Sequence, residues 1–104
     1  MRTIPIADVS LSEDGRLVVV PDIPSDDDFA FIYRAALSTR WLPEQRALTI
    51  VRDSKLTHTE ALGCILRAAL EEYGTRLVPT SQTTWHVSAE LKADLSEVLT
   101  NGAA

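Results

Sequence analysis

The stretch 57–74, THTEALGCILRAALEEYG, decides the fold because it carries helix signals at its start, along its length and at its end. Thr57 is a favoured N-cap residue, and Glu60, three residues later, completes a capping box. Gly74 occupies the position at which a left-handed residue ends many helices. The sequence therefore predicts a helix from about His58 to Tyr73.

Apolar residues recur along this predicted helix every three or four positions, a spacing that places them on one face. They are Leu62, Ile65, Leu66, Ala69, Leu70 and Tyr73. We therefore expect the helix to lie on a sheet with this stripe buried. Leu66→Ala is then expected to lower the free energy of unfolding by about 2–5 kcal/mol, because it removes packed methyl groups and leaves a cavity.

Two β-hairpins are predicted before the helix. Residues 4–11 and 16–20 flank a polar turn in which Gly15 supplies the positive φ of a short hairpin loop. Residues 39–42 and 47–51 flank a second turn that contains a proline. Both pairs of strands are expected to be antiparallel.

The segment 25–38, SDDDFAFIYRAALS, fits two patterns at once. Its apolar residues match helical spacing and also the alternation of a strand, so periodicity alone does not decide. Ser25 as an N-cap, the three aspartates that follow it and the three alanines favour a helix. We therefore predict a helix here, and a strand over residues 26–38 remains the alternative.

After the central helix, residues 76–79 and 83–87 are predicted to be short strands, and Ser88 is predicted to cap a last helix. The element order is then ββ-α-ββ-α-ββ-α. This order predicts an α+β two-layer sandwich, with about three helices on a largely antiparallel sheet. No repeat or linker divides the chain, so residues 1–104 are expected to form a single α+β domain with a frayed end from about 100 to 104.

The charge of the chain limits its partners. Ten Lys and Arg against fifteen Asp and Glu give a net charge of -5, which has the wrong sign for a phosphate backbone or an anionic membrane. We therefore expect neither nucleic acid nor membrane as a partner. Cys64, the single cysteine, cannot form an internal disulfide, and no signal peptide is visible, so a cytoplasmic location is expected.

Few residues in the sequence offer catalytic chemistry. His58 and His86 are the only histidines, and neither belongs to a recognisable motif. On the predicted helix, residues 58 and 64 point about 120° apart, so Cys64 cannot use His58 as a base. Phosphate-binding glycine loops and the ligand spacings of zinc and calcium sites are also missing. We predict no catalytic residue, no cofactor and no metal site.

Four residues are predicted as interface residues. Val18 and Val19 belong to the run 17–20, which is apolar on both faces and indicates either packing on each side or contact with another molecule. Trp41 and Trp85 lie in predicted strands, where core packing is the first interpretation and an interface anchor the second. With an unpaired strand edge, these residues predict docking or self-association through the sheet edge.

Scattered residues between about 29 and 99 form a familiar pattern: IYRAA at 32–36, Trp41, the EYG of residues 72–74, Thr80, Thr83 and Trp85. The pattern resembles that of small uncharacterised bacterial proteins, some of them found in integron gene cassettes. Ser38-Thr39 stands where this resemblance leads us to expect a glycine-containing turn. Such proteins are mostly without an assigned activity, so the resemblance implies no catalytic residue.

Two functions follow as expectations. The first is a small acidic, non-enzymatic module that binds a protein partner or forms a homo-oligomer, because the chain has a full core but no catalytic constellation. The alternative is a small enzyme or ligand-binding domain with a site assembled from dispersed residues: His86, Tyr33, Glu72 and Arg40. A deep pocket of converging polar groups favours the alternative, and a broad apolar patch favours the first.

Overall fold

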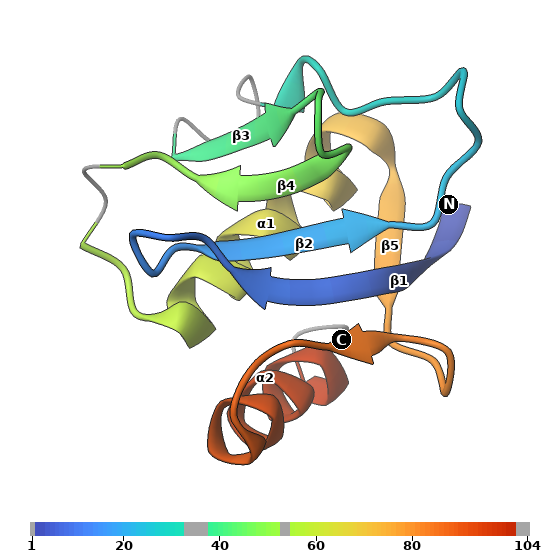
Figure 1. Ribbon diagram of the computed structural model, residues 1–104. Coiled ribbons are helices and arrows are strands. Elements are labelled where there is room, and N and C mark those ends of the chain that lie inside the picture. The colour runs from blue at the N-terminus through green and yellow to red at the C-terminus, as the bar shows by residue number, and fades with distance from the viewer. Residues whose placement is uncertain (1, 33–37, 53–54, 102–104) are drawn as a thin grey trace.

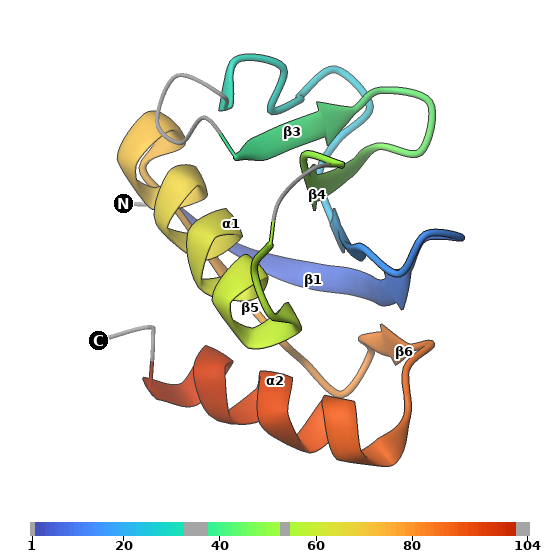
Figure 2. The same ribbon diagram turned by 90° about the vertical axis from the view of Figure 1, so that its left-hand side faces the viewer.

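The computed structural model describes residues 2–32, 38–52 and 55–101. Within them the elements are, in chain order, β1 (Arg2–Leu11), β2 (Leu17–Pro21), β3 (Thr39–Leu42), β4 (Ala47–Ile50), α1 (His58–Tyr73), β5 (Thr75–Val78), β6 (Thr84–Trp85) and α2 (Ala89–Asn101). The strands form one sheet, α1 lies across one of its faces, and α2 packs beside α1 (Figure 1, Figure 2). The fold class is α+β, as predicted.

The sheet is mixed, with the strand order β3-β4-β2-β1-β5 and with β6 also paired to β1. The two predicted hairpins are confirmed, and β2 pairs with β4 in the antiparallel sense as well. The prediction of a largely antiparallel sheet is wrong for β5 and β6, which both run parallel to β1. For β5 the reason is the helical crossover: α1 returns the chain so that β5 runs in the direction of β4, which is also the direction of β1. β6 pairs with a later part of β1 and continues in the direction of β5.

The predicted helix α1 is confirmed with both of its ends. The Thr57 side chain accepts a hydrogen bond from the N–H of Glu60, and the Glu60 side chain accepts one from the N–H of Thr57. Gly74 ends the helix in the left-handed conformation, with φ 57° and ψ 32°, and its N–H donates to the carbonyls of Ala69 and Leu70. These contacts satisfy backbone groups that a helix end leaves without partners.

The buried face of α1 is displaced from the predicted stripe. The buried residues are Ala61, Leu62, Ile65, Ala68 and Ala69. Leu66 is only half-buried, and Leu70 is 46% exposed, so the prediction that Leu70 is buried is wrong. α1 packs against α2 as well as against the sheet. Ala61 and Ala68, which lie outside the predicted stripe, are therefore buried too.

The α-helix predicted for 25–38 is wrong for the residues that the structure describes, since 22–31 form a loop with turns and Ile32 has a 3-10 conformation; residues 33–37 lie outside the described residues. In a helix the carbonyl of Asp27 would accept from the N–H of Phe31. Here that carbonyl accepts from Arg46, with a nitrogen–oxygen distance of 2.8 Å, and the Phe31 N–H donates to the Tyr73 hydroxyl at 2.9 Å. Contacts with distant residues therefore replace the helical hydrogen bonds.

Aspartate side chains also hold this loop locally. The Asp27 carboxylate accepts from the N–H of Asp28 at 2.9 Å, and the Asp28 carboxylate accepts from the N–H of Ala30 at 3.1 Å. Such bonds offer the backbone an alternative to a helix. The order ββ-α-ββ-α-ββ-α and the count of three helices are accordingly not found in the described chain.

The C-terminal helix α2 is confirmed, and the Ser88 hydroxyl accepts from the N–H of Leu91 at 3.2 Å. Leu95 and Leu99 are buried in the same core as Ile65 of α1 and Val19 of β2. The helix continues through Asn101, and the rest of the predicted frayed end, residues 102–104, lies outside the described residues. The core is therefore enclosed between the sheet and both helices.

Candidate functional site

Val18 and Val19 lie on β2, which is an interior strand paired with β1 and β4. Val19 is completely buried in the core, and Val18, on the opposite side of the strand, is 5% exposed. Val18 and Val19 are paired on both sides of the strand, so the prediction that they lie at a free sheet edge is wrong. The apolar character of both faces reflects burial on both faces.

Trp41 and Trp85 lie on outer strands, β3 and β6, and both are half-buried against the core. The Trp41 ring is 5.8 Å from the Phe29 ring, and the guanidinium of Arg46 lies 5.8 Å from the Trp41 ring centre. The ammonium of Lys92 lies 5.6 Å from the Trp85 ring centre. Each indole therefore has an intramolecular role, as a packing residue with a cation over its ring.

Two of the dispersed residues of the alternative site, Arg40 and His86, do not converge. Tyr33 lies outside the described residues. Arg40 belongs to β3, whereas His86 follows β6, and the three strands β4, β2 and β1 lie between. At about 4.8 Å per strand, this separation is about 19 Å. Glu72 is half-buried in the last turn of α1.

His86 directly follows β6 and contacts an acidic residue. Its Nε2 is 3.0 Å from Oδ2 of Asp8 on β1. The two side chains are 57% and 31% exposed, and ion pairs with this exposure contribute little to stability. This pair is therefore a surface contact of the sheet.

A shallow pocket of about 140 Å³ lies where the β1–β2 turn, the end of β4 and the start of α1 meet. It is lined by Asp14, Gly15, Arg16, Leu17, Ile50, Val51, Arg52, Leu56, His58 and Ala61. Residues 58 and 61 come from the first turn of α1, so the positive end of the helix dipole lies at the pocket. None of the predicted site residues that the structure describes lines it.

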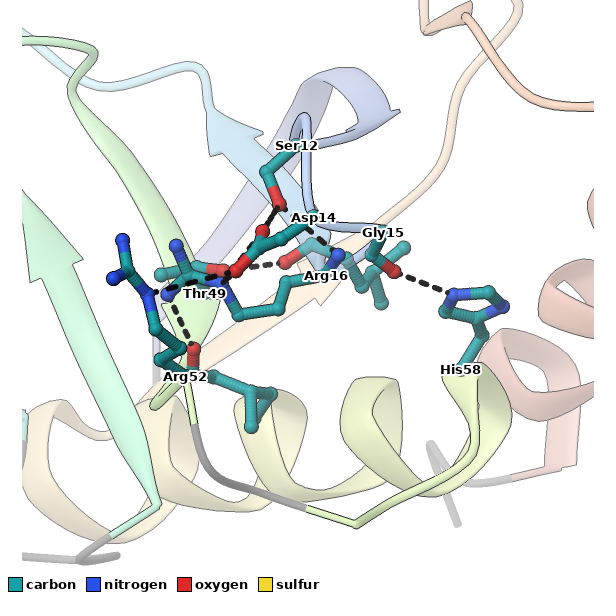
Figure 3. Close-up of polar contacts among 9 residues, drawn as sticks. Ser12, Asp14, Gly15, Arg16, Thr49, Arg52 and His58 are labelled. Carbon is teal, nitrogen blue, oxygen red and sulfur yellow. Dashed lines mark hydrogen bonds and ion pairs between the residues drawn. The ribbon is translucent and has the colours of Figure 1, made fainter.

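Asp14 is the centre of the polar network in this pocket (Figure 3). Its carboxylate accepts from the Ser12 hydroxyl and from Nε of Arg16, the latter at 2.9 and 3.0 Å. Nε of Arg52 lies 3.8 Å from the same carboxylate. Arg16 also donates from Nη1 to the carbonyl of Ile50 at 3.0 Å, which ties the turn to β4.

His58 connects the same turn to α1. Its Nε2 lies 2.8 Å from the carbonyl oxygen of Gly15, whose φ of 82° suits the tight turn. A carbonyl oxygen only accepts, so the proton is on Nε2 and the ring has a defined orientation. Cys64, further along α1, is a half-buried free cysteine.

The pKa of Asp14 predicts a change of stability with pH. Hydrogen bonds from Ser12 and Arg16 lower this pKa from 3.8 to about 2. The ionised form is thus favoured in the folded state, and its contribution is present above about pH 5 and is lost as the pH falls toward about 2. We expect Asp14→Asn to destabilise the protein near neutral pH and to make little difference at about pH 2. Urea unfolding at both pH values measures this, and an equal loss at both would contradict it.

The pocket was not predictable from the sequence because its charged residues are far apart in the chain. Asp14 and Arg16 flank Gly15, which is a visible local signal of a charged turn. Arg52 and His58 follow more than thirty residues later and meet the turn only through the pairing of β2 with β4 and the placement of α1.

Apolar side chains are exposed near the other end of α1. Phe31 is 51% exposed and Leu70 is 46% exposed. Tyr73 lies one turn after Leu70 on α1. Its hydroxyl accepts a hydrogen bond from the backbone N–H of Phe31, which links Phe31 to this part of the helix. Leu66, half-buried, lies one turn before Leu70. We call these four residues the α1 patch.

Neither helix is long and apolar enough for a membrane span, among the residues that the structure describes. The same residues contain no group of three or more His, Cys, Asp and Glu that could hold a metal ion.

Comparisons with known proteins relate the chain to a solved structure. It is similar to the integron cassette protein Hfx_Cass5 from the mobile metagenome of the North West Arm sewage outfall, with 29% sequence identity over 96% of this chain and 98% of that chain and a TM-score of 0.45. No family model matches the chain, and no curated protein matches it. The resemblance to an integron cassette protein that the sequence predicted is confirmed by this similarity.

Proposed function

We propose that the chain is a small non-enzymatic module that binds protein through the α1 patch, with a second copy of the chain as its partner. The observation that carries this proposal is the exposure of Phe31 and Leu70, with the Phe31 backbone tied to Tyr73, one turn after Leu70 on α1. Covering apolar surface of this kind is favourable by about 25 cal/mol per Å². We also propose that the protein is located in the cytoplasm, because its single cysteine cannot form an internal disulfide.

The arrangement of the patch suits a helix-to-helix contact. Leu66, Leu70 and Tyr73 follow the spacing at which one helix face docks on another surface. Arg67 and Glu71, both exposed, carry opposite charges beside it. A two-fold axis through the patch directs Arg67 of one copy toward Glu71 of the other, so the surface is complementary to itself.

The test is the oligomeric state of three proteins: the wild type, Leu70→Lys and Leu11→Lys. Leu11, 38% exposed at the end of β1, is the matched control because it is an exposed leucine outside the patch. We expect the wild type and Leu11→Lys to form dimers at high micromolar concentration and Leu70→Lys to remain monomeric, because a lysine charge in a buried contact is costly. Sedimentation equilibrium measures the mass, and circular dichroism verifies folding.

A monomeric wild type at high micromolar concentration would reject self-association. Protein binding is then decided by capture on the three immobilised proteins. A partner retained by the wild type and by Leu11→Lys but lost with Leu70→Lys keeps the module as a binder of another protein. Identical retention by all three proteins would reject the patch as the contact surface.

A further inference from the structure

The pocket at the start of α1 carries an excess of positive charge in an acidic chain. Among the residues that the structure describes, two arginines, Arg16 and Arg52, and one aspartate, Asp14, line it, which leaves one positive charge before His58 is counted. The chain as a whole has a net charge of -5. The pocket is therefore a local site of attraction for anions on a chain whose net charge is negative.

The two guanidinium groups share one carboxylate. Arg16 is 26% exposed and is held by Asp14 and by the Ile50 carbonyl. Arg52 is 81% exposed, and its ion pair with Asp14 has a distance of 3.8 Å, longer than a hydrogen bond. The planar guanidinium of Arg52 is thus available to a second oxyanion. The Asp14 carboxylate shows that the two arginines bind an oxyanion here (Figure 3).

We propose that this pocket binds a small oxyanion, with Arg52 as the main contact, Arg16 as the second contact and the Asp14 carboxylate as an internal competitor. The volume of about 140 Å³ fits an ion or the charged end of a larger molecule, because pockets for drug-sized ligands have about 300–1,000 Å³. The helix dipole of α1 adds a modest attraction. This site is independent of the α1 patch, which lies toward the other end of the same helix.

Inorganic phosphate is the probe, and sodium chloride at equal ionic strength is the control. Amide resonances of the isotopically labelled full chain are followed by NMR during each titration. We expect phosphate to cause saturable shifts that are confined to residues 14–16, to Arg52 and to the first turn of α1. Shifts spread over the whole surface, or shifts reproduced by chloride, would overturn the proposal.

Three variants assign the contacts. Arg52→Gln should weaken phosphate binding by about three- to tenfold, since a charge-assisted contact is lost. Arg76→Gln, at an exposed arginine of β5 outside the pocket, should bind phosphate as the wild type does. Asp14→Asn should bind it more tightly, because the competing negative charge is removed. Equal losses in both arginine variants, or weaker binding by Asp14→Asn at unchanged folding, would reject the assigned contacts.

Discussion

Phe29→Ala is expected to lower the free energy of unfolding by about 3–5 kcal/mol, because the ring is completely buried and its removal leaves a cavity. The ring meets Tyr73 edge-on at 4.8 Å between centroids and lies 5.8 Å from Trp41. Aromatic pairs of this geometry add about 0.5–1.5 kcal/mol beyond the area they bury. Phe29 thus joins the 22–31 loop to α1 and to β3.

Phe31→Ala is the control, since it makes the same chemical change two residues away on a side chain that is 51% exposed. Its expected loss is below about 1 kcal/mol. Urea unfolding followed by circular dichroism measures both variants. Similar losses for the two would mean that Phe29 does not anchor the loop, and the buried position of Phe29 would be contradicted.

Ile65→Ala is expected to cost about 2–5 kcal/mol, because Ile65 is completely buried at the centre of the face that α1 presents to the core. The matched control on the same helix is Leu70→Ala, with an expected loss below about 1 kcal/mol at 46% exposure. Leu66→Ala, expected from the sequence to cost as much as a core change, should fall between them because Leu66 is half-buried.

The order of these three losses tests which face of α1 is buried. Guanidinium chloride unfolding at one pH gives all three values, and a small domain has only about 5–15 kcal/mol in total, so Ile65→Ala is expected to approach partial unfolding. A loss for Leu70→Ala as large as that for Ile65→Ala would restore the stripe predicted from the sequence, which contains both residues. Leu70 would then be unsuitable as an exposed contact residue.

Most of the secondary structure was predictable because its signals are local. Thr57, Glu60 and Gly74 specify the two ends of α1 with groups that lie within a turn of each other. Gly15 supplies the positive φ of the first hairpin turn, and Ser88 caps α2. The candidate pocket was not predictable, because Asp14 and Arg52 contribute to it from separate hairpins.

The sequence by itself determined the two hairpins and both helices of the described chain, since those elements depend on neighbours within a few residues. Only the tertiary structure decided that 22–31 forms a loop, because Arg46 and Tyr73 take the hydrogen-bonding groups that a helix there would use. It also decided that β5 and β6 run parallel to β1, and which face of α1 is buried. These features depend on pairing and packing between residues far apart in the chain, about which local spacing carries no information.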